Sequence, residues 1–495
     1  AERPPDFNDK CAAFICSDIK NAIQEGIDKE DIIAGLVYSI CKNYYNRVKG
    51  NRATGKKIFM QGGVCYNKAV PIAMAALTGN SIVVPPEPGL MGAFGVALEI
   101  KNKLNLSLIE PQQFILAELI KREVKYLKGF NCAGGKEKCD RSCFINLIEI
   151  DGKKYPFGGA CNHYTNLTHS IEIDCENLDL VALRERLVFN KYAIKYNFDK
   201  DVKKIGIPKS LLVNTLYPLY YEFFSRLGLE VILADEVSEE GMDKKSAAFC
   251  YPIEQAHGFI QTLIKKKVDY IFLPHVLGMY VEANKSSNDS SSVVCPLVQA
   301  EPYYLKAAFK ELNEIEVLSP VLDFSKGYNN VVKEFENIGK SLGFSRKDSL
   351  KAYKFAFENQ RKFLKELQNI GKKVLEKLEH DTSKIGIVLF GRPYNAFSKS
   401  GNMGIPNKFA SRGYVIIPID FLPVKNMESG SNMYWSMGKS ILKASNFVKN
   451  NPKLFGVYIT NFSCGPDSFV VNYFRNIMGD KPSLTLELDS HTADA

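Results

Sequence analysis

Six short and almost uninterrupted apolar runs fall into two similar sets in the second half of the chain. They occupy 204–208, 228–233 and 270–274, and then 384–388, 413–418 and 456–460. Continuous apolar runs are typical of parallel strands that are buried on both faces. A helix-forming stretch separates the first two runs of each set, which is the pattern of a parallel crossover. The sequence therefore predicts two doubly wound α/β lobes, over 201–330 and 383–495.

The stretch between the lobes, 331–382, has a different periodicity. Its apolar residues recur at helical spacing, for example at Phe363, Leu367, Ile370, Val374 and Leu378. This spacing predicts a helical connector between the lobes.

The first 107 residues alternate between helical and strand-like patterns. A helix is predicted over 29–48, with Cys41 in the core and an apolar stripe of Ile33, Val37, Ile40, Tyr44 and Val48. Strands are predicted at 57–60 and 81–84. The first strand runs into Gly62-Gly63, where two glycines permit either the close approach of a ligand or a plain tight turn.

Composition and charge narrow the possible functions. A chain of 495 residues is too long for one core, so several domains are expected. Its net charge of +9 is dispersed, and no apolar run approaches the ~20 residues of a membrane span, so neither nucleic acid nor membrane is an expected partner. Twelve cysteines in such a chain indicate a reducing, cytoplasmic setting. Because Ala1 replaces an initiator Met, we expect an internal segment that works with the remainder of a parent chain.

Three cysteines share one local pattern, in which a proline follows one or two residues later. They are Cys250, Cys295 and Cys464. Because proline cannot continue a strand ladder, each cysteine is predicted to lie where a strand ends, and ligands bind at such edges of open α/β sheets. Our hypothesis is that the three thiolates hold an iron–sulfur cluster and leave one iron free. The alternative is three buried, small apolar side chains.

A second group of cysteines lies among glycines in 108–200, which we predict to be a connecting domain. It comprises Cys132, Cys139, Cys143 and Cys161. Four thiolates on glycine-rich turns suit a closed zinc site or a second [4Fe–4S] cluster. Separate buried thiols are the alternative.

Three polar residues near the first cysteine group are candidates for catalysis. His257 is a candidate proton donor, although a buried histidine with satisfied hydrogen bonds is an equally good interpretation. Gln299 is a candidate for substrate contact, and Arg392 for pairing with an anionic group, although structural salt bridges are the usual role of such an arginine.

Three short segments carry a resemblance to a known family. They are Asp9-Lys10-Cys11-Ala12, the turn at 62–64 with Asn67, and 88–93. They resemble the activator ATPases of 2-hydroxyacyl-CoA dehydratases and benzoyl-CoA reductases, which have the actin/sugar-kinase/Hsp70 ATPase fold. The resemblance covers the C-terminal half of that fold, and implies that Cys11 ligates a [4Fe–4S] cluster shared across a homodimer. It also implies that Gly62, Gly63 and Asn67 belong to the adenosine site. The phosphate-binding segments belong to the other half, so ATP and Mg would bind in the complete protein, and this chain alone is not expected to hydrolyse ATP.

The cysteine–proline motifs carry a second resemblance. The segments 250–257, 295–302 and 461–467 look like the domain fused behind activator ATPases, which is similar to the cluster-bearing subunits of 2-hydroxyacyl-CoA dehydratases and to double-cubane cluster proteins. This resemblance implies a [4Fe–4S] cluster, or half of an [8Fe–9S] cluster, on Cys250, Cys295 and Cys464. The Cys132–Cys161 group has no counterpart that we can place.

The favoured function is that of an ATP-driven electron-transfer protein. The resemblance implies a ferredoxin or flavodoxin as donor and an acyl-CoA or another small molecule as acceptor. Two alternatives remain: a non-catalytic scaffold stabilised by zinc, and a plain nucleotide-binding, kinase-like enzyme.

Overall fold

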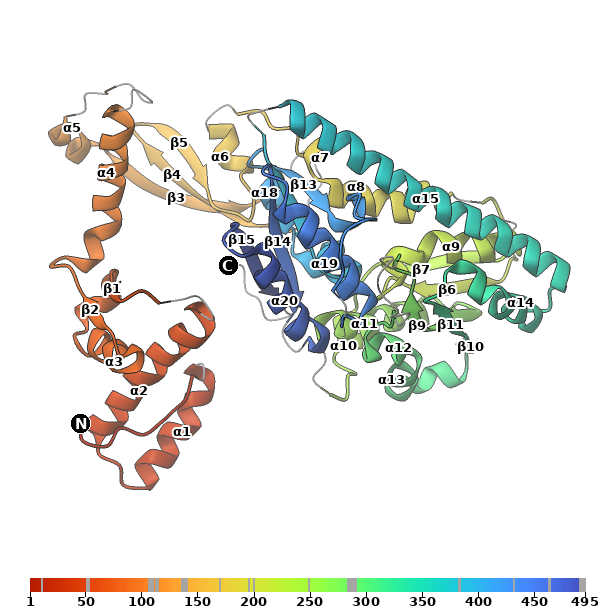
Figure 1. Ribbon diagram of the computed structural model, residues 1–495, viewed down its shortest axis with the longest axis horizontal. Helices are drawn as coiled ribbons and strands as arrows, with labels where there is room; N and C mark the ends of the chain where they lie inside the picture. Colours follow the sequence, from red (N-terminus) through yellow and green to blue (C-terminus); the bar gives the residue numbers. More distant parts are fainter. Residues whose placement is uncertain are drawn as a thin grey trace. The chain divides into compact units, whose positions relative to one another are not determined.

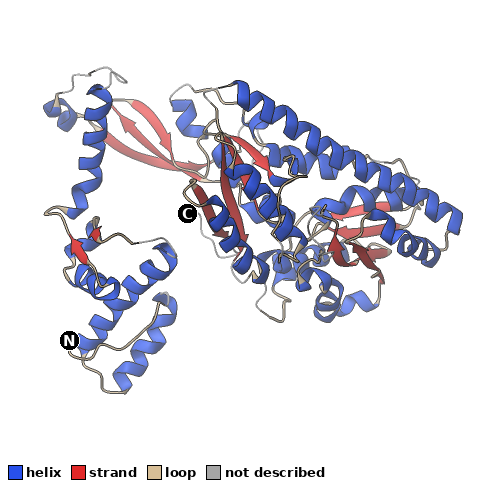
Figure 2. Ribbon diagram, viewed as in Figure 1, coloured by secondary structure: helices blue, strands red, loops and turns tan. Residues whose placement is uncertain are grey.

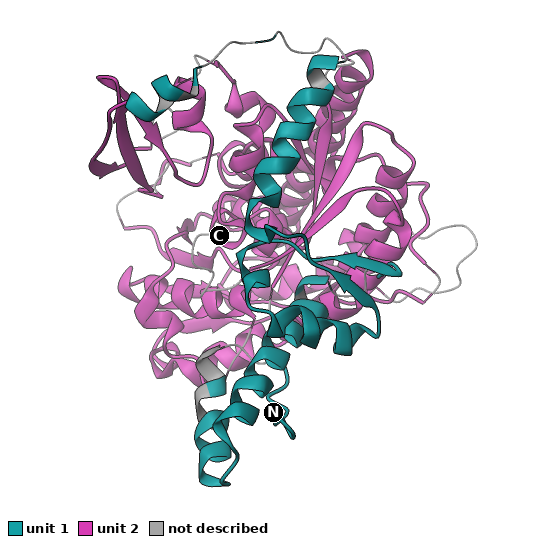
Figure 3. Cartoon of the chain, turned by 90° about the vertical axis from the view of Figure 1, so that its left-hand side faces the viewer, with its two compact units in different colours: residues 1–121 teal, residues 122–495 magenta. Residues whose placement is uncertain are grey.

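The computed structural model divides into two compact units, Ala1–Lys121 and Arg122–Ala495 (Figure 1 and Figure 3). The structure describes residues 1–9, 12–49, 54–105, 111, 115–134, 141–168, 171–194, 196–198, 201–247, 250–282, 292–381, 384–430, 432–461 and 464–488. Within these ranges, none of the helices combines the length and the apolarity needed to cross a membrane.

The first unit contains a small strand–helix–strand element. β1 (Lys57–Phe59) and β2 (Ser81–Val83) pair in parallel, and α3 (Ala69–Thr78) connects them. Both strands lie where the apolar runs predicted them, to within one residue. The other elements are α1 (Ala12–Gln24), α2 (Lys29–Asn43), the π-helical turn η1 (Tyr44–Lys49), the 3₁₀ turns η2 (Gly63–Tyr66) and η3 (Pro88–Leu90), α4 (Met91–Asn105) and α5 (Leu116–Lys121).

Helix α2 buries a different face from the one that its apolar stripe predicted. Ile33 and Ile40 are more than half exposed, whereas Ile32 and Cys41 are buried. Cys41 is therefore in the core as predicted, whereas most of the predicted apolar stripe is exposed. The helix is apolar on two sides, and the described residues cover one of them.

The second unit begins with a three-stranded antiparallel sheet that the sequence did not predict. β3 (Val124–Asn131), β4 (Phe144–Ile150) and β5 (Lys153–Phe157) pair in the order of the chain. The following helix α6 (His163–Thr168) is tied to a distant segment, because the Asn166 side chain donates to the Ser411 carbonyl at 2.8 Å.

Two four-stranded parallel sheets follow, and their strand orders are equivalent. The first runs β10 (Glu316–Leu318), β8 (Tyr270–Phe272), β6 (Lys204–Pro208), β7 (Glu230–Ala234), and the second runs β13 (Val415–Pro418), β12 (Gly386–Phe390), β14 (Leu454–Asn461), β15 (Ser483–Leu488). In both sheets the first strand of the chain lies between the second and the third. The prediction of α/β structure with parallel sheets is confirmed. The bounds of the five predicted domains remain predictions.

Helices flank both sheets (Figure 2). They are α7 (Cys175–Leu178), α8 (Leu180–Arg186), α9 (Val213–Arg226), α10 (Glu239–Met242), α11 (Tyr251–Lys265), α12 (Pro296–Gln299), α13 (Glu301–Ala308), α14 (Val332–Ser341), α15 (Arg346–His380), α16 (Pro393–Ala396), α17 (Lys399–Asn402), α18 (Ile405–Ala410), α19 (Ser436–Lys449) and α20 (Gly465–Met478). Short elements complete the unit: the parallel pair β9 (His275–Met279) and β11 (Val321–Phe324), and η5 (Leu187–Lys191), η6 (Lys310–Asn313), η7 (Tyr328–Val331) and η8 (Ile419–Phe421).

The long helix α15 joins the two parallel sheets into one body. The predicted connector is indeed helical, and its buried face includes Phe363 and Leu367. Gln360 donates to the Thr215 carbonyl beside the first sheet, at 3.0 Å, and Gln368 donates to the Asp420 carbonyl beside the second, at 2.7 Å. One continuous hydrophobic core contains residues of both sheets and of α15, so the groups between the sheets are held by a packed scaffold.

Candidate functional site

Each of the three proline-flanked cysteines caps the N-terminus of a helix. Cys250 precedes α11, Cys295 precedes α12 and Cys464 precedes α20, and each helix has a proline in its first turn. Proline is favoured there because the first helical N–H groups have no partner within the helix. The prediction that each cysteine ends a strand is wrong for Cys250, which comes after α10, and for Cys295, which follows an isolated bridge at Val293. The proline marks a helix start in all three cases.

The segment before Cys295 is hydrogen-bonded to the second half of the unit. The Val293 amide donates to the Tyr434 carbonyl at 3.0 Å, and the Ser436 amide donates to the Val293 carbonyl at 2.8 Å. These bonds cross from the region of the first sheet to that of the second, because α19, which starts at Ser436, lies between β13 and β14 in the chain. They fix the position of Cys295 against residues more than a hundred positions away.

In their thiolate form, the three cysteines would all act on the same buried phenol, that of Tyr394. Burial raises the pKa of Tyr394, Arg392 acts against this, and negative charges on Cys295, Cys464 and Cys250 raise the pKa further. Charge interactions in a protein fall off with distance, so all three sulfurs lie within electrostatic range of one ring. The structure thus brings together the regions of the chain that the motif singled out.

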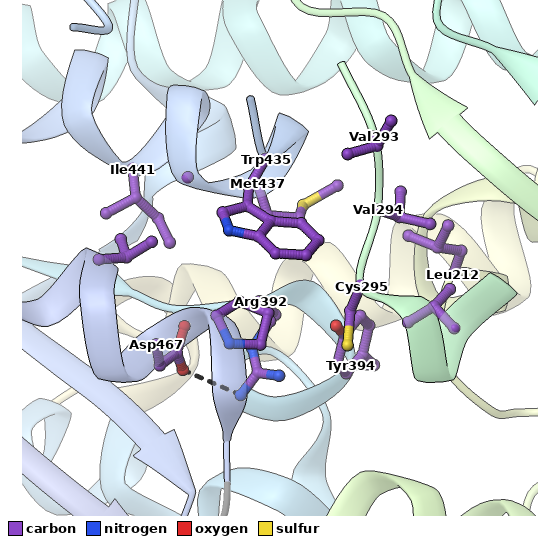
Figure 4. Close-up of a pocket in the computed structure, with 14 residues that line it drawn as sticks. Leu212, Val293, Val294, Cys295, Arg392, Tyr394, Trp435, Met437, Ile441 and Asp467 are labelled. Atoms are coloured by element: carbon purple, nitrogen blue, oxygen red, sulfur yellow. Dashed lines mark hydrogen bonds and ion pairs between the residues drawn. The ribbon is translucent and has the colours of Figure 1, made fainter. Parts of the chain in front are cut away.

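A pocket opens beside these residues and is lined from both halves of the unit (Figure 4). It is small, with a cavity volume of about 20 Å³. Cys295 and Leu212 line it from the first half, and Arg392, Trp435 and Asp467 line it from the second. Arg392 and Asp467 follow the carboxyl ends of β12 and β14, the adjacent strands at which the order of the second sheet reverses. This is where open α/β sheets bind ligands.

Arg392 is held in the pocket wall by a buried ion pair. Its Nη2 atom donates to Asp467 Oδ2 at 2.9 Å and to Asn461 Oδ1 at 3.2 Å. Asp467 also accepts from Tyr458 and Thr460, at 3.0 and 2.6 Å. A fixed ion pair therefore lies close to Cys250 and Cys464, and its guanidinium lowers the pKa of both thiols while its carboxylate raises it.

Burial governs the ionisation of two of the three thiols. It raises the pKa of Cys250, and it raises that of Cys464 to about 12, while Arg392 lowers both. Metal ligation requires the thiolate, so binding of a metal here would release protons.

The residues around the cysteines fit an anionic cluster. Arg392 Nε and Gln255 Nε2 are buried N–H groups for which the described residues supply no acceptor. Arg392 lies close to Cys250 and Cys464, and an N–H donor near the sulfurs stabilises an iron–sulfur cluster. Across the described ranges no group of three His, Cys, Asp or Glu side chains is arranged around a single ion position. A site for a single metal ion requires its ligands to surround one position, whereas in a cubane cluster each cysteine binds a different iron.

Two of the predicted catalytic side chains are engaged by backbone groups. His257, on α11, is buried, and its Nδ1 lies 2.8 Å from the Ile253 carbonyl oxygen. Burial lowers its pKa, which favours a neutral imidazole. Gln299 donates to the Val294 carbonyl at 2.8 Å and so braces the turn that carries Cys295. Of the three candidates, Arg392 lines the pocket.

The second cysteine group lies around the ends of the antiparallel sheet. The Cys132 amide, after β3, donates to the Cys143 carbonyl, before β4, at 2.8 Å. Burial raises the pKa of Tyr164 to about 12, and a hydrogen bond with Cys132 and the charges of Cys132 and Cys161 add to this. Cys139 lies outside the described residues, as does Cys11.

The predicted nucleotide turn follows β1 in the first unit. Gly62 has φ 102° and ψ 163°, a conformation open to glycine alone, and its amide donates to the Pro88 carbonyl at 2.7 Å. Among the described residues, none approaches within 4 Å of a Cβ built on Gly62 or Gly63, so the turn is open on that side. Asn67 is exposed, and its side chain accepts from the Ala69 amide at 3.1 Å.

Sequence reasoning missed several residues of the site. Tyr394 and Asp467 stand inside motifs that were recognised, but nothing in the sequence distinguished them from their neighbours. Trp435 is the chain's single tryptophan, which could have drawn attention to it.

Comparisons with known proteins match the two ends of the chain to different families. Residues 1–99 match the BadF/BadG/BcrA/BcrD ATPase family, and residues 204–422 match the CoA enzyme activase uncharacterised domain (DUF2229). A 2-hydroxyisocaproyl-CoA dehydratase activator of Clostridioides difficile is 35% identical over 88 residues, which are 18% of this chain and 33% of the relative. An activator of lactoyl-CoA dehydratase of Anaerotignum propionicum is 31% identical over 91 residues, 18% of this chain and 34% of the relative.

A solved structure is also similar in part. The activator of the 2-hydroxyisocaproyl-CoA dehydratase from Clostridium difficile with bound ADPNP is 26% identical, with a TM-score of 0.20, over 23% of this chain and 43% of that chain. The chain spans about a third of the length of the curated activators that it matches. The resemblance stated from the sequence is confirmed by the two family matches. The chain thus matches the BadF/BadG/BcrA/BcrD ATPase family over residues 1–99 and, in a fusion-like arrangement, the CoA enzyme activase uncharacterised domain over residues 204–422.

Proposed function

We propose that this chain is the iron–sulfur electron-transfer segment of an ATP-dependent system that resembles acyl-CoA dehydratases. Cys250, Cys295 and Cys464 would hold a [4Fe–4S] cluster or half of an [8Fe–9S] cluster. The observation that carries the proposal is that three sequence-distant cysteines cap helices around one buried pair, Arg392 and Tyr394.

The chain's own groups have defined tasks in this proposal. The guanidinium of Arg392, fixed by Asp467, would favour the thiolate form of the ligands, and its buried Nε would be able to donate a hydrogen bond to the bound group. Apolar residues of the pocket, Leu212, Val298 and Trp435 among them, exclude water. The cluster supplies one-electron transfer, and its open iron would face the acceptor, an acyl-CoA or another small molecule.

The first unit connects this site to ATP. Its relatives are named as dehydratase activators, and the related solved structure carries ADPNP. We therefore assign Gly62, Gly63 and Asn67 to an adenosine site that binds ATP and Mg in the complete protein. Cys11 would ligate a cluster shared by a homodimer, reduced by a ferredoxin or flavodoxin.

Anaerobic reconstitution with iron and sulfide tests the proposal. The complete parent protein should bind about four irons at this site, and these should be absent from the triple Ser variant of Cys250, Cys295 and Cys464. A triple Ser variant of Cys41, Cys65 and Cys175 is the matched control, because it removes the same number of cysteines elsewhere in the chain. Equal iron content in the two variants would refute the proposal.

A second candidate function rests on the other cysteine group. Cys132 and Cys161 lie near Tyr164, and Cys143 accepts a backbone hydrogen bond from Cys132. With Cys139 they could form a zinc site that stabilises a non-catalytic scaffold. In that case the protein purified without oxygen contains zinc, is colourless and has no redox signal. A coloured protein with iron at these four cysteines would instead indicate a second [4Fe–4S] cluster.

A further inference from the structure

Glu301 is a buried carboxyl group at the carboxyl ends of the central strands of the first sheet. It is the first residue of α13 and is 6% exposed. It lines a second cavity together with Pro208, which ends β6, and Leu273 and Pro274, which follow β8. The order of the first sheet reverses between β6 and β8, so this cavity is the counterpart of the pocket at Arg392.

The surroundings of Glu301 offer little to stabilise a negative charge. Most of the cavity wall is apolar, with Leu212, Val276 and Val298 among its residues. Ser210 Oγ donates to Glu301 Oε1 at 2.5 Å. Burial raises the pKa of Glu301 to about 7, and the bond from Ser210 acts in the opposite direction.

The titratable groups near Glu301 are phenols or are engaged by other partners. The phenols of Tyr220 and Tyr304, on α9 and α13, are within range of its charge. Lys209, beside Ser210, pairs with Glu185 at 2.5 Å. His275, beside Pro274, is bonded through Nδ1 to the Gln299 carbonyl at 2.9 Å.

The cavity at Glu301 adjoins the pocket of the proposed cluster. Leu212 and Val298 line both spaces. Negative charge on Glu301, Cys250 or Cys295 raises the pKa of Tyr304. The Tyr304 phenol therefore lies within electrostatic range of both the carboxyl group and these two cysteines, in a buried region where charges are weakly screened.

We propose that Glu301 binds a proton when the centre held by Cys250, Cys295 and Cys464 gains an electron, and releases it when the centre is oxidised. The electron comes from a low-potential donor of the ferredoxin or flavodoxin class and the proton comes from water, so one negative and one positive charge enter together. An electron added near a carboxylate favours its protonation by charge repulsion. This inference rests on the proposed function.

Redox titration of the reconstituted parent protein between pH 5.5 and 8.5 tests the inference. In the wild type the midpoint potential should fall as pH rises across and above pH 7, by up to about 59 mV for each tenfold change in proton concentration. In Glu301→Gln the potential should not depend on pH in this range. Glu314→Gln, an exposed carboxyl in the loop after α13, is the control and should follow the wild type.

A second variant and a second readout make the result decisive. Ser210→Ala keeps the carboxyl but removes the bond that lowers its pKa, so it should shift the pH-dependent range upward. Infrared spectroscopy of the cluster-free protein should show a protonated carboxyl band at pH 6 that is lost in Glu301→Gln. Two results would overturn this inference alone. In the first, iron binds but the midpoint potential of Glu301→Gln depends on pH as that of the wild type does. In the second, Glu301 is already ionised at pH 6. Failure to bind iron overturns the proposed function as well.

Discussion

Arg392 and Asp467 form a salt bridge that is almost completely enclosed. Their charged atoms are 2.9 Å apart, and the two side chains are 4% and 3% exposed. Asp467 lies in the first turn of α20, three residues after Cys464, and its amide donates to the Cys464 sulfur at 3.4 Å. The same turn therefore carries a proposed ligand and the residue that anchors Arg392.

Replacing Asp467 with Asn should destabilise the second unit strongly. The change leaves Arg392 charged, buried and without its counter-ion, and loss of one partner of a buried pair costs about 3–5 kcal/mol. The free energy of unfolding of the second unit, measured with denaturant at pH 7, should fall by about 3 kcal/mol or more.

The control for this variant is Glu240→Gln. Glu240 pairs with Lys265 at 2.6 Å, but both side chains are more than half exposed. Exposed pairs contribute at most about 1 kcal/mol, so this variant should unfold nearly as the wild type does. Similar losses in the two variants would contradict a structural role for the buried pair.

The strands of both parallel sheets could be predicted because their side chains are uniformly apolar. Ile387, Val388 and Leu389 are all buried in β12, as a continuous apolar run requires. Helix α2 was harder, because it is apolar on two sides and periodicity does not state which side packs. Its continuation as a π-helix also changes the phase of the stripe.

The candidate site could be predicted only in part. The repeated cysteine–proline pattern selected Cys250, Cys295 and Cys464, but it was interpreted as a strand end, since proline is excluded from ladders and also favoured in the first turn of helices. Glu301 carried no signal at all. Its character comes from burial against residues far away in the sequence, such as Leu273.

Gly371→Ala should destabilise the second unit through α15. A Cβ at this position would overlap the Phe421 carbonyl oxygen of η8, so the helix would have to move away from the second sheet. Overpacking of this kind costs about 1–3 kcal/mol or more. Denaturant unfolding of the second unit measures the loss.

A matched glycine in another helix should give the opposite sign. Gly95, in α4 of the first unit, meets no described heavy atom within 4 Å of an added Cβ. Gly95→Ala should therefore stabilise that helix by about 0.5–1 kcal/mol, the difference in helix propensity. A loss of stability at Gly95, or none at Gly371, would contradict the packing of these helices.

Gly62→Ala should weaken binding of adenine nucleotide by the complete parent protein. No described atom obstructs the new methyl group, so the effect comes from the backbone conformation at φ 102°. Strain of about 1–3 kcal/mol corresponds to a dissociation constant raised roughly 5- to 150-fold. Gly79→Ala, at φ 64° on the C-terminus of α3, strains the same unit away from the proposed site. Calorimetric titration should show nearly wild-type affinity for it; equal losses in the two variants would point to general destabilisation.

Glu301→Gln should change how stability depends on pH. Because burial holds the pKa of Glu301 at about 7 in the folded protein, against an ordinary value of 4.5, the protonated carboxyl favours folding. Its contribution is complete below pH 4.5 and is lost as pH rises through 7. Glutamine keeps the bond from Ser210 and cannot ionise. The difference in the free energy of unfolding between the variant and the wild type should therefore be ~3 kcal/mol more favourable to the variant at pH 8 than at pH 4.5. Denaturant unfolding at the two pH values measures this gain, and Glu314→Gln should show none. If the two variants change in parallel, Glu301 is not the group that holds a proton at neutral pH.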